Sequence, residues 1–263
     1  MDFGLKGKVA VVAAASQGLG RAIAEELAAE GARVALCSRD TARIEAAAEA
    51  IRRSTGAETL AVTADVTRAE EVERFVAAAV ERWGAVHVAV ANAGGPPAKE
   101  FPAITLEDWE NSIQLNLMSS VYLARAVLPR MRAQQWGRLL FLTSASVKQP
   151  IDGLLLSNSV RSAVAGLAKS LANEYARDNV TVNVLCPGFI GTERLQELAE
   201  TLASQKGVKP EDIYTGWNAS IPMARVGEPR ELAALVAFLA SERASYITGT
   251  AMAVDGGRVK SLI

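Results

Sequence analysis

Residues 9–21, VAVVAAASQGLGR, decide the fold of this 263-residue chain. Val9–Ala14 is a continuous apolar run without alternation, which is typical of a strand that is covered on both faces. The run is followed by Gly18 and Gly20, and a helix is expected to begin near Arg21. A strand, a glycine turn and a helix in direct succession predict the start of a βαβ unit.

The same pattern continues along the rest of the chain. Apolar runs alternate with segments whose apolar residues recur at three- and four-residue steps, which indicates strands alternating with amphipathic helices. This alternation predicts an α/β fold: a doubly wound, mostly parallel, seven-stranded sheet between two helical layers, a Rossmann fold, as a single domain over residues 1–263. The expected strands are Val9–Ala14, Arg33–Ser38, Thr59–Ala64, Val86–Ala91, Arg138–Thr143, Thr181–Cys186 and Ala251–Val254.

Two segments need separate treatment. Thr105–Arg132 opens with a capping box of Thr105 and Asp108 and is predicted to form one long helix. Residues 192–228 contain two short helical patterns and no predicted strand, and we call this segment the lid. It follows the sixth strand, so it is expected to cover the carboxyl ends of the strands, where open α/β sheets bind ligands. The apolar residues of this region predict either a substrate pocket or packing within the lid. They are Ile190, which lies just before the lid, and Leu195, Leu198, Ile213, Trp217 and Ile221 within it.

Composition excludes several classes of function. The 28 basic residues nearly balance the 29 acidic ones, and the sequence has no run of five like charges. Nucleic-acid binding is therefore not expected. Cys37 and Cys186 lie in apolar runs, which is typical of buried free thiols in a reducing compartment. No apolar leader precedes the first strand and no apolar run approaches the length of a membrane span, so a cytoplasmic protein is expected.

The glycine turn predicts a dinucleotide site, with a plain tight turn as the alternative. Glycines let the backbone approach a pyrophosphate, and the following helix offers amide donors and the positive end of its dipole. The second strand ends at Ser38-Arg39, where a fold that binds NAD usually carries an acid. The Arg39 guanidinium suits a 2′-phosphate, so NADP(H) is favoured, with a solvated loop arginine as the other interpretation.

Further motifs in the same order resemble those of the classical short-chain dehydrogenase/reductase (SDR) family, and of 3-oxoacyl-carrier-protein reductases in particular, over nearly the whole chain. Asp65-Val66, Asn92–Gly94 and Asp255–Gly257 are similar to family motifs, whereas Ala13-Ala14 replaces the family's Thr-Gly. The resemblance implies a cofactor site made of Ala14, Ser16, Gln17, Gly18, Leu19, Gly20, Ser38, Arg39, Asp65, Val66, Asn92, Ala93, Gly94, Arg161, Pro187, Gly188 and Thr192.

The resemblance also implies a catalytic relay. In the family a tyrosine moves the substrate proton, and a lysine lowers the pKa of that tyrosine and holds the nicotinamide ribose. A serine, matched by Ser144, positions the carbonyl oxygen, and an asparagine, matched by Asn116, anchors water. A phenol, whose pKa is about 10, needs the neighbouring cation to act as an acid or base near neutral pH.

This chain departs from the family at the tyrosine and the lysine. Residues 157–161, SNSVR, stand where the family has YxxxK, and the match of residues 164–171 downstream fixes that register. Arg161 is expected to keep a positive charge near the nicotinamide and to hold its ribose. Ser157 titrates far less readily than a phenol. The predicted catalytic residues are therefore Asn116, Ser144, Ser157 and Arg161.

Another group is then needed to move the proton. Lys148 is the first candidate, with an exposed loop lysine as the other interpretation, and Asp152 and Tyr214 are further candidates. His87, the only histidine, is predicted to be structural, and no metal site is expected.

Three functions stay open at this point. The first is an NADP(H)-dependent oxidoreductase acting on a small carbonyl or alcohol. The second is a dinucleotide-binding pseudoenzyme or sensor that lacks the tyrosine, and the third is an assembly protein without a working cofactor site. The family resemblance implies a homodimer or homotetramer through the Thr105–Arg132 helix and the helix after Ser157, with neither nucleic acid nor membrane as partner.

Overall fold

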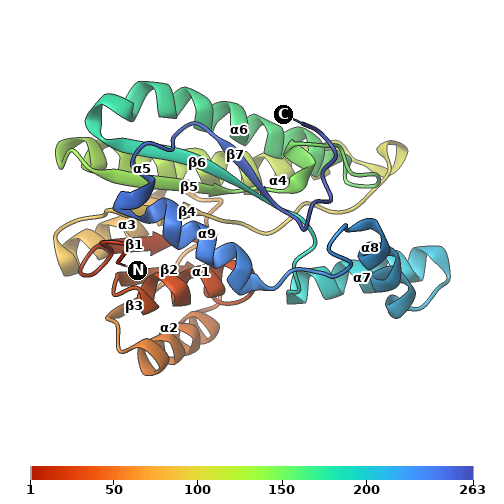
Figure 1. Cartoon of the computed structure of the whole chain (residues 1–263), viewed down its shortest axis with the longest axis horizontal. Helices are drawn as coiled ribbons and strands as arrows, with labels where there is room; N and C mark the ends of the chain where they lie inside the picture. Colours follow the sequence, from red (N-terminus) through yellow and green to blue (C-terminus); the bar gives the residue numbers. More distant parts are fainter. Residues whose placement is uncertain (1, 263) are drawn as a thin grey trace.

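The computed structural model describes residues 2–262. Seven parallel strands form one sheet in the order β3-β2-β1-β4-β5-β6-β7, with helices on both faces (Figure 1). The predicted fold class is confirmed. The strands are β1 (Val9–Val12), β2 (Arg33–Ser38), β3 (Thr59–Thr63), β4 (Val88–Ala91), β5 (Gly137–Leu142), β6 (Val180–Pro187) and β7 (Ala251–Val254).

The helices divide between the two faces of the sheet because side chains alternate along each strand. Val9 and Val11 of β1 pack into a core with α3, α5 and α6, whereas Ala10 and Val12 pack into a second core with α1, α2 and α9. The helices are α1 (Gly18–Ala29), α2 (Thr41–Thr55), α3 (Ala69–Trp83), α4 (Leu106–Ser112), α5 (Ser119–Ala133), α6 (Leu155–Tyr175), α7 (Glu193–Lys206), α8 (Pro210–Ser220) and α9 (Pro229–Ala240).

The strand order reverses between β1 and β4. Strand β1 pairs with β2 on one side and with β4 on the other, so the loops that follow β1 and β4 lead to opposite halves of the sheet. The carboxyl edge at such a reversal is where doubly wound sheets form a ligand crevice.

Two predicted boundaries differ from the structure for local reasons. Strand β1 ends at Val12 instead of Ala14, because Ala14 has φ +48° and so lies outside the extended region. The predicted long helix is one helical run from α4 to α5, but residues Ile113–Met118 in its middle form a π-helix. The Thr105–Asp108 capping box at its start is present, with both reciprocal hydrogen bonds.

The lid contains α7 and α8, which lie together at one end of the molecule (Figure 1). Part of the lid packs on itself: Ala199, Ala203 and Ile213 form a cluster, and Trp217 packs against it. Leu198, by contrast, lines a large cavity at the carboxyl edge of the sheet. A bridge between Ile190 and Gly227 joins the two ends of the lid. Lid packing therefore accounts for Ile213 and Trp217 better than a substrate pocket does.

The helices and the two cysteines of the chain show two further features. Within residues 2–262, no helix combines the length and apolar character needed to cross a membrane. Cys37 and Cys186 are both free and buried, and burial raises the pKa of the Cys37 thiol to about 12.

His87 lies just before β4 and supports the sheet. Its Nδ1 accepts a hydrogen bond from the Val9 backbone N–H at 3.0 Å, and its ring meets Trp136 edge to face. Nδ1 can accept this bond only when it carries no proton, that is, in the neutral imidazole with its proton on Nε2. Burial first, and then the charge of Lys8, lower the pKa of His87 below its ordinary 6.5.

We therefore expect His87 to make stability depend on pH. Its pKa is lower in the folded state, so the unfolded chain binds more protons between the two values. The free energy of unfolding should fall as the pH drops through 6.5 and level off below the folded-state pKa. His87→Asn keeps an acceptor for Val9 and does not titrate. Denaturant unfolding of both proteins over a pH series measures the difference, and identical pH profiles would contradict this prediction.

Candidate functional site

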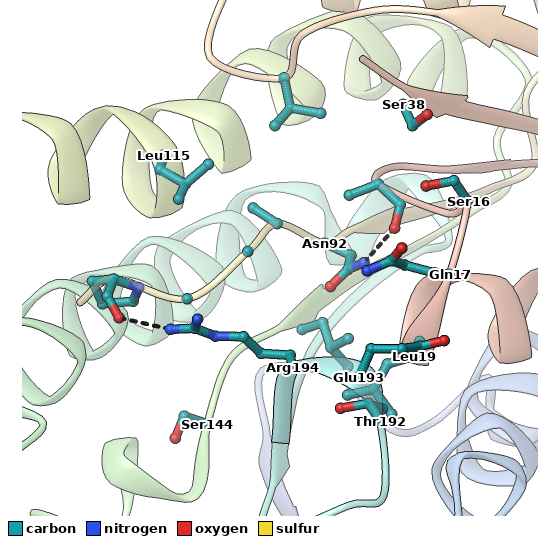
Figure 2. A pocket seen from close by; sticks show the side chains of 18 of the residues that line it. Ser16, Gln17, Leu19, Ser38, Asn92, Leu115, Ser144, Thr192, Glu193 and Arg194 are labelled. Atoms are coloured by element: carbon teal, nitrogen blue, oxygen red, sulfur yellow. Dashed lines mark hydrogen bonds between the residues drawn. The ribbon is translucent and has the colours of Figure 1, made fainter. Parts of the chain in front are cut away.

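A cavity of about 870 Å³ opens at the carboxyl edge of the sheet, between the strand ends and the lid (Figure 2). Loops after six strands and the first turn of α7 contribute to its wall. Its size is within the range of cavities that enclose small-molecule ligands and cofactors. It lies where the strand order reverses, as expected for this topology.

The glycine turn forms one wall of this cavity. Gln17 is extended, and α1 begins at Gly18, whose φ of +58° favours a residue without a side chain. Gly20 lies where helix and strand meet: an added Cβ would be 2.4 Å from the Ala14 carbonyl oxygen and 2.7 Å from Asn92 Nδ2. Asn92 Nδ2 donates to the carbonyls of Ala13 and Ala14 at 3.2 and 3.1 Å and so fixes the turn.

The wall beyond this turn is polar and carries two arginines. Ser38, Arg39 and Arg43 line it, and Arg43 donates to the Gln17 side chain at 3.1 Å. Asp40 stands one residue after Arg39; its carboxylate caps α2 by accepting from the Arg43 backbone N–H and also forms an ion pair with Arg43 Nε at 3.5 Å. Arg39 makes no ion pair among the residues described and is exposed. This end of the cavity can therefore bind a phosphate.

The opposite, inner end carries hydroxyl groups. Ser157 Oγ lies 3.2 Å from Ser146 Oγ, and the Ser146 N–H donates to Ser144 Oγ at 3.1 Å. Ser144 and Ser157 line the cavity, and Ser144 points into the open space in Figure 2. No tyrosine, lysine or histidine of residues 2–262 lines the cavity.

Arg161 lies one turn after Ser157 on α6 and is 8% exposed. Its Nη1 donates to the carbonyls of Leu142 and Thr143 at 3.2 and 3.0 Å, and its Nη2 donates to the Gly94 carbonyl at 3.3 Å. These bonds tie α6 to the ends of β4 and β5. Burial first, and then the charge of Arg194, lower the pKa of Arg161 to about 10.

Asn116 lies behind this end of the cavity, on the π-helix. Its Nδ2 donates to the Gly94 carbonyl at 2.7 Å, and its buried Oδ1 has no hydrogen-bond partner among the residues described. A buried acceptor of this kind ordinarily has a donor, so the position fits an ordered water or a ligand group.

The structure brings nearly all the predicted site residues to this cavity. Two do not line it: Gly20 lies under the turn, and Asn116 lies behind Gly94. Those that line it are Ala14, Ser16, Gln17, Gly18, Leu19, Ser38, Arg39, Asp65, Val66, Asn92, Ala93, Gly94, Ser144, Ser157, Arg161, Pro187, Gly188 and Thr192.

The sequence of this chain is similar to that of known proteins over nearly its whole length. The model of the family described as enoyl-(acyl carrier protein) reductase matches residues 13–258. Dehydrogenase/reductase SDR family member 4 of Bos taurus is 35% identical over 259 residues, which cover 98% of this chain and 89% of the relative. The chain belongs to the short-chain dehydrogenase/reductase family.

This short-chain dehydrogenase/reductase is also similar to members from bacteria. The 3-oxoacyl-[acyl-carrier-protein] reductase FabG of Aquifex aeolicus is 33% identical over 257 residues, 98% of this chain and 99% of that protein. The crystal structure of L-sorbose reductase from Gluconobacter frateurii, complexed with NADPH and L-sorbose, is 35% identical, has a TM-score of 0.94, and covers 100% of both chains.

The three side chains that the sequence of this short-chain dehydrogenase/reductase suggested for moving the proton are not part of the cavity wall. Lys148, Asp152 and Tyr214 were the candidates to replace a tyrosine, but none of them lines the cavity. Tyr214 packs edge to face on Trp217 in the lid and borders a separate groove. Position in the loop after Ser144 or in the lid does not show the direction of a side chain.

Sequence reasoning missed several residues in the cavity wall. Arg194 reaches into the cavity from α7, and its Nη2 donates to the Pro96 carbonyl at 3.3 Å (Figure 2). Glu193 lies against the glycine turn, with an oxygen 3.7 Å from where a Gly18 Cβ would be. Gly95 follows the motif at 92–94 and lies beside Arg194. Among residues 2–262, no group of three or more His, Cys, Asp or Glu side chains is placed to hold a metal ion.

Proposed function

We propose that this protein is an NADP(H)-dependent oxidoreductase that transfers hydride between the nicotinamide and a carbonyl or alcohol substrate. One observation carries the proposal: a single cavity runs from Arg39 and Arg43, past the uncovered turn at Gly18, to Ser144 and Ser157. A dinucleotide needs these same features in this order, namely cations for a 2′-phosphate, a helix N-terminus for the pyrophosphate, and a hydrogen-bonding inner end. The NADPH in the crystal structure of the L-sorbose reductase supports the same cofactor class.

The residues of the chain have defined tasks in this proposal. A bound nicotinamide would supply the hydride to the carbonyl carbon, and the carbonyl oxygen would take a proton that comes from solvent water. Ser144 and Ser157 would hold the carbonyl oxygen, and Arg161 would keep α6 and the two strand ends in place. Neither serine releases a proton as readily as a phenol, so we expect slow turnover.

Oxidation of NADPH in the presence of a panel of aldehydes, ketones and oxo acids tests the reaction. We expect measurable oxidation with at least one carbonyl compound. A protein that binds NADPH but oxidises it with none of them would instead be a sensor or pseudoenzyme. Ser157 in place of a phenol at the inner end of the cavity favours that second candidate.

Arg39 is the residue that should discriminate between the two dinucleotides. Loss of a charge-assisted hydrogen bond costs about 1.5–3 kcal/mol, so Arg39→Gln should raise the Kd for NADPH about tenfold or more and leave that for NADH unchanged. Arg52→Gln on the exposed face of α2 removes the same charge outside the cavity and serves as the control. Equal Kd values for NADPH and NADH in the wild type would refute the NADP(H) preference.

Exposed apolar residues near α4 are relevant to the oligomeric state. Phe101, Leu106 and Ile113 are exposed near the start of α4, and apolar surface of this kind favours association. We propose a homodimer or homotetramer, which light scattering on the purified protein measures.

A further inference from the structure

Arg161 holds a positive charge inside the protein without a carboxylate. Within residues 2–262 it makes no ion pair, and three of its five N–H groups donate to backbone carbonyls. Buried cations in proteins are ordinarily paired with an anion, because their desolvation is expensive. The side chain is 8% exposed and lines the cavity, so its remaining donors are available to a ligand there.

Arg194 brings a second cation to the same place. A carbon at the Cβ position of Gly95 would lie 3.6 Å from Arg194 Nε, 3.7 Å from Arg194 Nη2 and 4.0 Å from Arg161 Nη2. Both guanidinium groups therefore border the space where Gly95 has no side chain. They are close enough that Arg194 further lowers the pKa of Arg161, which indicates mutual repulsion.

The described acidic residues of the cavity leave Arg161 without an ion-pair partner. Glu197, which also lines the cavity, forms an ion pair with Arg194 Nη1 at 3.4 Å, and both side chains are more than half exposed, so water screens this pair. Glu193 lies against Gly18, and Asp40 caps α2. Asp65 accepts hydrogen bonds from the backbone and hydroxyl of Thr67. Among the described residues no carboxylate forms an ion pair with Arg161, and the buried guanidinium keeps its charge without one.

We propose that the inner end of the cavity binds the carboxylate of the substrate, held over Gly95 by Arg161 and Arg194, so that the substrates are oxo acids and the corresponding hydroxy acids. A guanidinium matches a planar carboxylate through paired hydrogen bonds. Ser144 and Ser157 line the same end of the cavity as the two arginines. This inference rests on the proposed function, because it names the substrate class of that same site.

Calorimetric titration with matched ligands tests the inference. Carboxylates from acetate to benzoate, each paired with its amide, are titrated into protein saturated with NADPH and, separately, into protein without cofactor. We expect the acids to bind at least about tenfold more tightly than the amides, since charge-assisted bonds are the stronger ones. Oxidation of NADPH with benzoylformate and with its methyl ester gives the same comparison in turnover.

Three variants assign the effect to the residues. Arg194→Gln should remove most of the preference for acid over amide, and Arg194→Lys should retain part of it. Gly95→Ala should reduce it as well, because its Cβ would make only ordinary contacts with the protein but would fill the space over Gly95. Arg230→Gln, which removes an exposed arginine on α9 outside the cavity, should leave the preference unchanged.

The outcomes separate this inference from the proposed function. Equal binding of acids and amides, no saturable binding of any acid, or an acid preference that survives Arg194→Gln would overturn the carboxylate site. Absence of NADPH binding would overturn the proposed function instead. The titration without cofactor then still decides whether Arg161 and Arg194 hold an anion.

Discussion

Replacing Ser157 with tyrosine is expected to raise kcat for reduction of a carbonyl substrate by about 10²- to 10⁴-fold, the usual contribution of a positioned general acid. Ser157 lines the inner end of the cavity, and a phenol attached at this position of α6 can extend into that space. The positive charge of Arg161, one helical turn away, would favour the phenolate and so lower the pKa of the new tyrosine.

The matched control for this variant is Ser157→Phe. Phenylalanine adds the same ring without the hydroxyl, so it reproduces every steric effect but supplies no proton. Turnover by Ser157→Phe should stay at or below the wild-type level in single-turnover measurements with NADPH. A rise in Ser157→Phe equal to that in Ser157→Tyr, or no rise in either, would show that the missing phenol does not limit the rate.

Replacing Gly20 with alanine is expected to cost about 1–3 kcal/mol of stability and to weaken NADPH binding at least about tenfold. The added Cβ would lie 2.4 Å from the Ala14 carbonyl oxygen, a distance that requires the backbone of the turn to move. Movement of this turn also displaces the first N–H groups of α1, which are expected to bind the pyrophosphate. Denaturant unfolding and NADPH titration measure the two effects.

Gly166 provides the control for Gly20. It is exposed in the middle of α6, and a Cβ there would meet no atom within 4 Å. Gly166→Ala should be neutral or should raise the free energy of unfolding by up to about 1 kcal/mol, because alanine is the better helix former. Equal losses in both variants would argue that Gly20 has no special role in the turn.

The fold could be predicted because its signals are local. Each of the first six strands is an apolar run followed by a helix, and all seven predicted strands are present, with ends that differ by no more than two residues. The end of the cavity near Arg39 was predictable for the same reason, since Ser38 is the last residue of β2 and Arg39 directly follows it. The π-helix at 113–118 had no comparable signal in the sequence.

The inner end of the cavity depends on contacts that no local pattern encodes. Arg194 reaches the cavity only because α7 folds back over the strand ends, far from Gly95 in sequence. The partners of Arg161 are backbone carbonyls at the ends of β4 and β5, which the identity of residue 161 does not indicate. Lys148 seemed available for catalysis on sequence grounds, but the cavity wall does not include it.

The central claim is that this cavity binds a nicotinamide dinucleotide, and an equilibrium titration of the wild-type protein with NADPH tests it most directly. We predict saturable binding of one NADPH per chain, tighter than that of NADH and weakened by Gly20→Ala. Titration without saturation for either dinucleotide, in protein that is folded by circular dichroism, would contradict the claim.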